Sequence, residues 1–219
     1  MSKQITVNGE ELVLHAAGAL WWPGEETLVF ADLHFEKGSS YARSGQMLPP
    51  YDTRTTLKRM AALVAEHAPA RIIALGDSFH DRHAAERLDD EERAMLSTLS
   101  RGTEWIWIAG NHDPEPPAWL GGRVAEEIAI GALTFRHEPL PGGAPGEIAG
   151  HLHPCARVSR HGRSLRLRCF ASDGARMVLP AFGAYTGGLD VRDRALRSLF
   201  ADAFRAYVLG RATVYAVAA

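Results

Sequence analysis

Three short apolar segments of this chain each run directly into polar residues with oxygen or imidazole side chains. Residues 27–31 are followed by Asp-Leu-His, residues 71–75 by Gly-Asp, and residues 105–109 by Gly-Asn-His-Asp. Runs of this length and apolarity are typical of strands buried on both faces of a parallel sheet. Ligand sites in such sheets form at the carboxyl ends of the strands. The sequence therefore predicts an α/β sheet with a polar site at that edge.

The expected elements change in character along the chain. They are a hairpin over residues 5–7 and 11–15, helices over 52–67, 89–99 and 190–208, and further strands over 133–136, 147–149, 164–170, 177–182 and 213–217. An α/β first half followed by a β-rich second half predicts two packed sheets flanked by helices. Because the chain contains no internal repeat and no long polar linker, we expect a single domain over residues 1–219.

The polar residues at these strand ends share the donor types of a metal site. The set is Asp32, His34, Asp77, Asn111, His112, His137, His151 and His153. Oxygen and imidazole donors without thiolate favour Mn²⁺, Fe or Zn²⁺. Bare carboxylates at apolar strand ends are costly unless a cation offsets their desolvation. In extended backbone, residues i and i+2 point the same way, so Asp-Leu-His and His-Leu-His each present two donors to one side. Gly76, Gly110 and Gly150 immediately precede donors and permit close backbone approach.

The ordered motifs resemble the calcineurin-like metallophosphoesterase superfamily. DLH, GDSFHD, GNHD, a single histidine at His137, and GHLH follow one another between Asp32 and His153. The longer strings DLHFEKGSSYARSGQMLPPYDT and ALGDSFHD are similar to a bacterial subgroup, the ligase-associated metallophosphoesterases (PdeM), which is linked to DNA repair. The resemblance implies a four-layer α/β/β/α sandwich of two mixed β-sheets flanked by helices, the metallo-dependent phosphatase-like arrangement.

The resemblance also implies cofactors and residue roles. Two divalent ions are expected, Mn²⁺ first, with Fe and Zn²⁺ as alternatives. The implied ligands are Asp32, His34, Asp77 and His153 for one ion, and Asp77, Asn111, His137 and His151 for the other. The implied reaction is hydrolysis of a phosphodiester by attack of a hydroxide that bridges the ions. His112 resembles the histidine that protonates the leaving oxygen, and His80 resembles a nuclease histidine that places the phosphate. Asp81 and Asp113 are candidates to orient these two rings.

The net charge limits the classes of binding partner that we expect, and the cysteine content indicates the cellular compartment. With a net charge of −2 and a pI near 6.6, no chain-wide basic field attracts nucleic acid or a membrane, so we expect weak unaided binding to DNA. The densest basic stretch is Arg157, Arg160, Arg163, Arg166 and Arg168, for which a solvated strand edge is favoured over a nucleic-acid contact. Two cysteines and no apolar leader predict a cytoplasmic protein with reduced thiols.

Substrate and partners stay open at this point. The alternatives to DNA ends or strands are a small nucleotide or cyclic diester, a phosphomonoester, or a non-catalytic role in a repair complex. Candidate partners are DNA-repair proteins including a ligase, and a second copy of the chain; no membrane partner is expected. His15, His67, His83 and His161 lie outside every motif and are expected to be exposed rather than ligating.

Overall fold

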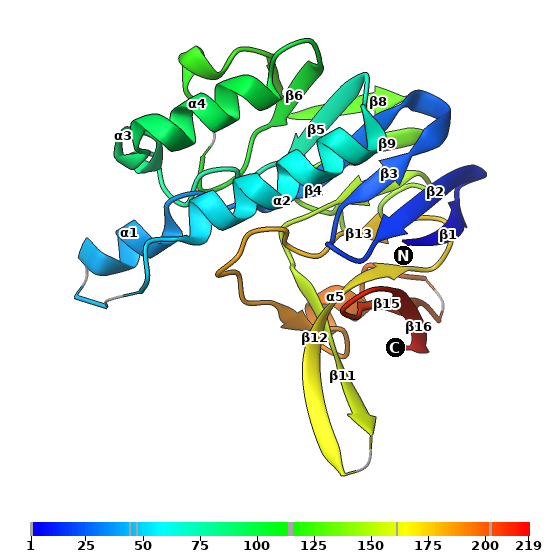
Figure 1. Cartoon of the computed structure of the whole chain (residues 1–219). Helices are drawn as coiled ribbons and strands as arrows, with labels where there is room; N and C mark the ends of the chain where they lie inside the picture. The colour runs from blue at the N-terminus through cyan, green and yellow to red at the C-terminus, as the bar shows by residue number, and fades with distance from the viewer. Residues whose placement is uncertain (1, 44, 47, 114–115, 161, 202) are drawn as a thin grey trace.

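Two β-sheets packed face to face form the centre of the molecule, as the computed structural model shows (Figure 1). The structure describes residues 2–43, 45–46, 48–113, 116–160, 162–201 and 203–219. Helices cover the outer face of the first sheet, and a short helix with its flanking loop covers the outer face of the second. The α/β/β/α sandwich of mixed sheets is confirmed, with its fourth layer reduced to one helical turn.

The first sheet carries the parallel strands predicted from the apolar segments. Within the described residues it has seven strands, in the order β1 (Ser2–Val7), β2 (Glu10–His15), β3 (Leu20–Trp22), β4 (Thr27–Ala31), β5 (Arg71–Leu75), β6 (Glu104–Ile108) and β7 (Arg123–Ala125). Strands β4 to β7 are parallel, and β1 to β4 pair antiparallel. The carboxyl ends of β4, β5 and β6 therefore meet at one edge.

The first half has four described helices, of which all but the first pack on this sheet. They are α1 (Lys37–Arg43), α2 (Asp52–His67), α3 (Ala84–Arg87) and α4 (Asp90–Leu99), with 3₁₀ turns η1 (Pro23–Glu25) and η2 (Ala118–Leu120). Helix α4 begins with a capping box, in which Asp89 accepts the Glu92 N–H and Glu92 accepts the Asp89 N–H. Helix α2 ends where Ala68 adopts a φ of 44° and returns its N–H to Val64.

The second sheet is built mainly from the β-rich second half. Its described strands are, in order, β14 (Leu189–Asp190), β11 (Pro154–Arg160), β12 (Arg163–Ser172), β13 (Met177–Val178), β10 (Glu147–Ala149), β9 (Leu133–Arg136) and β8 (Glu127–Ile130), while β15 (Arg205–Leu209) joins β12 to β16 (Val214–Ala218). Strands β9 and β10 are parallel, so the residues after them also share an edge.

Alternating side chains of the central strands fill two cores. Leu28 and Phe30 of β4 pack with Met60 of α2. Val29 of β4 faces the other way and packs with Phe135 of the second sheet. Burying each such side chain stabilises the fold by about 1.5–3 kcal/mol. Both faces of β4 are therefore held, which fixes the backbone that leads into the polar edge.

Two of the expected elements differ in the structure. The helix expected over 190–208 is wrong: only α5 (Arg194–Arg197) is helical, because Leu189–Asp190 pairs with β11 and Arg205–Leu209 pairs with β12 and β16. The strand expected over 177–182 is shortened to Met177–Val178. Pro180 has no N–H to continue the ladder. None of the described helices is long and apolar enough to cross a bilayer.

Candidate metal centre

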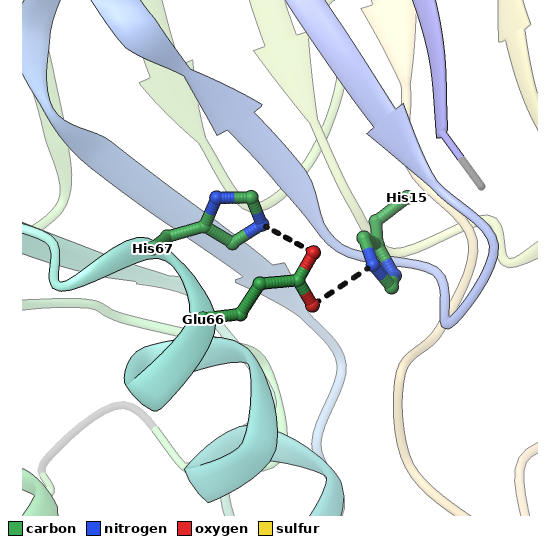
Figure 2. Close-up of side chains that lie close together, drawn as sticks. All are labelled: His15, Glu66 and His67. Atoms are coloured by element: carbon green, nitrogen blue, oxygen red, sulfur yellow. Dashed lines mark ion pairs between the residues drawn. The ribbon is translucent and has the colours of Figure 1, made fainter.

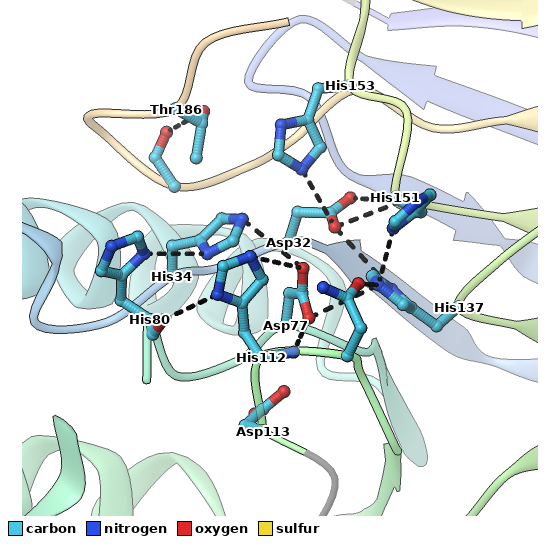
Figure 3. Close-up of polar contacts among 12 residues, drawn as sticks. Asp32, His34, Asp77, His80, His112, Asp113, His137, His151, His153 and Thr186 are labelled. Atoms are coloured by element: carbon cyan, nitrogen blue, oxygen red, sulfur yellow. Dashed lines mark hydrogen bonds and ion pairs between the residues drawn. The ribbon is translucent and has the colours of Figure 1, made fainter. Parts of the chain in front are cut away.

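The polar edge gathers the candidate metal ligands together with His80 and His112 (Figure 3). Asp32 and His34 follow β4, Asp77 and His80 follow β5, Asn111 and His112 follow β6, His137 follows β9, and His151 and His153 lie between β10 and β11. Both sheets contribute, since the ends of β9 and β10 face the ends of β4 and β5. The cluster depends on the packing of the two sheets, which brings together residues distant in sequence.

The backbone is strained at five donor positions. Positive φ angles occur at Asp32 (52°), His34 (45°), Asp77 (44°), His151 (67°) and His153 (47°). Such conformations cost a non-glycine residue on the order of 1–3 kcal/mol each. They persist where the surrounding structure imposes them, and they cluster at functional sites. The strained backbone at these five positions indicates that the required directions of the donor side chains, rather than local stability, determine this part of the fold.

Asp77 lies between two groups of donors. Its Oδ2 is 3.9 Å from His34 Nε2, and its Oδ1 is 3.4 Å from His137 Nε2. The backbone N–H of His112 donates to Oδ1 at 3.0 Å, which fixes the carboxylate plane. The two oxygens of this buried side chain therefore face opposite groups.

The first group combines Asp32, His34 and His153, whose ligand atoms lie within 4.8 Å of one another. Asp32 Oδ1 is 3.1 Å from His153 Nε2, and the His151 N–H donates to Asp32 Oδ2 at 3.0 Å. The Nε2 atoms of His34 and His153 are buried and make no hydrogen bond with the described residues. Buried polar atoms without partners are costly, so these two nitrogens suit the ligation of a cation.

The second group combines Asp77, His137 and His151, again within 4.8 Å, with Asn111 beside it. His137 Nδ1 donates to the Leu75 carbonyl at 3.0 Å, which leaves Nε2 as the atom that faces the group. That Nε2 lies 2.9 Å from Asn111 Oδ1 and 3.2 Å from His151 Nδ1. A nitrogen surrounded by acceptors requires a proton or a metal ion.

The ion pairs and pKa shifts of the site also indicate that its carboxylates favour a nearby positive charge. Within the described part of the chain, the ion pairs of Asp32 and Asp77 are all with histidines. Burial alone would lower the pKa of His137, but Asp77 and Asp32 outweigh it and raise the pKa to about 9. Burial lowers the pKa of His34 well below its ordinary value, although Asp77 opposes this. His34 is therefore a neutral imidazole, the form that binds metals.

The glycines before the donors are required by close packing. A Cβ on Gly76, whose φ is +65°, would overlap the His137 ring. A Cβ on Gly150 would lie 2.8 Å from Asp32 Oδ2, and one on Gly110 would overlap the backbone N of Asp77. The expectation of close backbone approach at these positions is confirmed.

His112 and His80 flank the centre. His112 Nδ1 donates to the His80 carbonyl at 2.9 Å, its Nε2 lies 4.0 Å from Asp77 Oδ2, and 42% of its side chain is exposed. The His80 ring stacks between His112 and Tyr41, with centroids 5.4 Å and 5.9 Å away. Burial, together with the charge of Lys37, lowers the pKa of His80 to about 4, so its ring is neutral near pH 7.

The two acidic residues proposed to orient these rings do something else. Asp81 pairs with Arg87 at 2.8 Å, and Asp113 accepts the Phe79 N–H at 2.9 Å. Burial raises the pKa of Asp113 to about 7. His112 is instead oriented by the His80 carbonyl.

Tyr41 and Lys37 were not singled out individually from the sequence. Both belong to the string that carries the subgroup resemblance, which is the signal that could have found them. In the structure Tyr41 stacks on His80, and Lys37 Nζ lies 6.0 Å from the Tyr41 ring centroid. Both residues lie on α1, and Tyr41 links this helix to His80.

A separate His-Glu group lies between β2 and the end of α2 (Figure 2). Contrary to expectation, His15 and His67 are mostly buried, at 18% and 15% side-chain exposure; His83 is exposed, and His161 lies outside the described residues. The Ala17 N–H donates to His15 Nδ1 at 3.1 Å, so the neutral ring carries its proton on Nε2, which faces Glu66 at 3.5 Å. That tautomer offers the group no nitrogen lone pair from His15, and the cluster joins β2 to α2.

Comparison with known proteins agrees with this geometry. The calcineurin-like phosphoesterase family model matches residues 26–168. The chain is similar to the crystal structure of nuclease MPE from Pseudomonas putida, with 33% identity over 99% of this chain and 100% of that chain and a TM-score of 0.78. It is also similar to Yfce, a phosphoesterase from E. coli, with 14% identity over 88% and 98% of the two chains and a TM-score of 0.45. No match was found among curated proteins. The resemblance seen in the sequence is confirmed: the chain belongs to the calcineurin-like phosphoesterase family.

Proposed function

We infer that this chain is a dinuclear, metal-dependent phosphodiesterase that cleaves nucleic acid. The observation that carries this inference is the position of Asp77, whose two oxygens face two separate groups of buried donors. One carboxylate placed in this way suits a pair of cations better than a single one.

The donor groups define the ligand sets. Asp32, His34, Asp77 and His153 would hold one ion, and Asp77, Asn111, His137 and His151 would hold the other. Carboxylate, amide and imidazole donors suit Mn²⁺, with Fe and Zn²⁺ as alternatives. When bound, two such ions lower the pKa of water and stabilise the negative charge that develops on phosphoryl oxygens.

The flanking histidines supply the remaining functions. His112 is anchored through Nδ1, so its Nε2 is the atom that transfers a proton to the leaving oxygen. His80 is neutral and held between two rings, and it positions the phosphate by hydrogen bonding rather than by charge. Two divalent ions would contribute a charge of +4, Asp32 and Asp77 contribute −2, and an attacking hydroxide contributes −1. The remaining charge of +1 suits the single negative charge of a diester.

The choice of nucleic acid rests on the comparisons. The Pseudomonas putida protein, which is similar along 99% of this chain, is named as a nuclease. The string from Asp32 to Thr53 resembles the ligase-associated subgroup, and this resemblance supports a role in DNA repair.

A substrate panel tests the proposal. Protein loaded with Mn²⁺ should hydrolyse an aryl phosphodiester faster than the matching aryl phosphomonoester and should cut a single-stranded oligonucleotide, and chelation should abolish each activity. Faster turnover of the monoester would replace the diesterase with a phosphatase. No metal-dependent turnover of any substrate would support the non-catalytic role.

A further inference from the structure

The β11–β12 hairpin projects away from the two packed sheets (Figure 1). It begins at Pro154, directly after the proposed metal ligand His153. Residues 155, 157 and 159 of β11 lie opposite residues 168, 166 and 164 of β12, so these side chains share one face. The face leads away from the metal centre and is lined by arginines.

Three exposed arginines meet on this face. Arg157 and Arg166 are directly opposite each other across the hairpin. Arg192 comes from a later part of the chain, because β14 pairs parallel with β11 and places Asp190 beside Cys155. Asp190 contacts Arg192 Nε at 3.1 Å and Arg157 Nε at 3.7 Å. We call Arg157, Arg166 and Arg192 the arginine row.

Arg168, on the same face, has a structural role. It is largely buried and donates through Nη1 to the carbonyls of Ala181 and Gly183, at 2.9 Å and 3.1 Å. The Gly183 N–H in turn donates to the Asp32 carbonyl at 3.1 Å. Arg168 therefore holds the loop that supports the metal centre. The side chains of Arg160 and Arg163 lie outside the described residues.

The arginine row carries more positive charge than the fold needs. Like charges directly opposite on a hairpin destabilise it. Arg157 and Arg192 share the single carboxylate of Asp190, Arg166 donates to a neutral carbonyl, and the side chains of Arg157 and Arg192 are 59% and 64% exposed. Guanidinium groups pair with phosphate through two parallel hydrogen bonds, so a phosphodiester backbone is the complementary partner.

The row is continuous with the metal centre. Arg166 donates to the Gly188 carbonyl, and the next residue, Leu189, donates its N–H to the His153 carbonyl at 3.1 Å. Along β11, Arg157 lies about 13 Å from His153 at the usual rise of a strand. A strand whose phosphate lies at the centre therefore reaches the row with its neighbouring nucleotides.

We propose that the arginine row binds the phosphate backbone of the nucleic-acid substrate beyond the bond that is cleaved. The proposal rests on the proposed function for the identity of the substrate and adds the surface that holds it. It revises the expectation of a merely solvated strand edge, because that expectation did not include Arg192 or the opposed pair.

Salt-dependent binding tests the proposal. The Mn²⁺-loaded full chain is titrated onto labelled phosphorothioate oligonucleotides of about 12 nucleotides, single-stranded and duplex, and fluorescence anisotropy is followed between about 50 and 200 mM salt. The double variant Arg157→Gln/Arg192→Gln should bind more weakly, and the slope of log Kd against log salt should fall by about 1.4 for the single strand or about 1.8 for the duplex. Arg166 is left in place because it also holds Gly188.

The matched control is Arg101→Gln/Arg123→Gln, which removes the same charge from exposed positions before β6 and at the start of β7, in the region of the first sheet. Its salt slope should equal that of the wild type. Equal slopes for both double variants, or no salt-dependent binding of either oligonucleotide by the wild type, would overturn the proposal. Thermal melting and Mn²⁺ content verify that each variant is folded. Hydrolysis of the aryl diester by the wild type tests the proposed function separately.

Discussion

Replacing His112 by alanine separates proton transfer from metal binding. His112 is not among the proposed ligands, and its Nδ1 is committed to the His80 carbonyl at 2.9 Å. Its Nε2, 4.0 Å from Asp77 Oδ2, is the atom available to a leaving oxygen. General acid catalysis contributes about 10²–10⁴ in rate, or about 2.7–5.5 kcal/mol of barrier. That contribution depends on how much the leaving oxygen needs a proton.

The assay therefore compares two substrates. A nitrophenolate leaves readily as an anion, whereas the sugar alkoxide of a dinucleotide leaves poorly without a proton. His112→Ala should keep its Mn²⁺, lose about 10²–10⁴ in kcat/KM on the dinucleotide, and lose much less on the aryl diester. His137→Ala should reduce both activities together through loss of metal, and the exposed His83→Ala should change neither. Equal losses on both substrates by metal-replete His112→Ala would refute the acid role and leave phosphate binding in its place.

Further predictions concern metal affinity and stability. Because the pKa of His137 is raised to about 9, its proton must leave before Nε2 binds a metal. The Mn²⁺ affinity, measured by titration calorimetry, should therefore rise about tenfold per pH unit between about pH 6 and 8. A constant affinity over this range would contradict the prediction. Gly76→Ala should lose its bound Mn²⁺. Its free energy of unfolding, measured in urea, should fall by about 1–3 kcal/mol more than that of Gly102→Ala, whose Cβ meets nothing within 4 Å. Arg176→Met, which breaks the buried pair with Glu147, should cost about 3–5 kcal/mol by the same measurement; a loss below 1 kcal/mol would mean that the pair contributes little.

The parts of the fold that the sequence predicted are those with local signals. Apolar runs that are buried on both faces indicate strands β4, β5 and β6. The motifs after these strands lie at one edge of the sheet because parallel strands end together. Helix α2 was predicted at its observed bounds, since its apolar spacing and the proline after it are both local. The candidate donors of the site were identified from the same short motifs.

The parts that were missed depend on pairing between distant segments. Residues 205–209 read as the end of a helix, yet they lie between β12 and β16, whose ladders impose an extended backbone. Arg192 joins Arg157 only through the β14–β11 pairing, and no spacing in the sequence shows that register. The stacking of Tyr41 on His80 likewise requires α1 to pack beside the loop after β5. Local patterns identify the donors, and the tertiary pairing decides what surrounds them.

The central claim is that Asp77 joins two ions, and metal content measures it directly. The wild-type chain, loaded with Mn²⁺ and freed of excess metal, should hold about two ions by elemental analysis. The isosteric variant Asp77→Asn should lose both more readily than Asn111→Ala, which lacks a ligand to one ion only and should keep about one. Melting curves of the metal-free proteins verify that both variants are folded. A folded Asp77→Asn that retains one tightly held ion, as Asn111→Ala does, would contradict the shared carboxylate and with it the dinuclear centre.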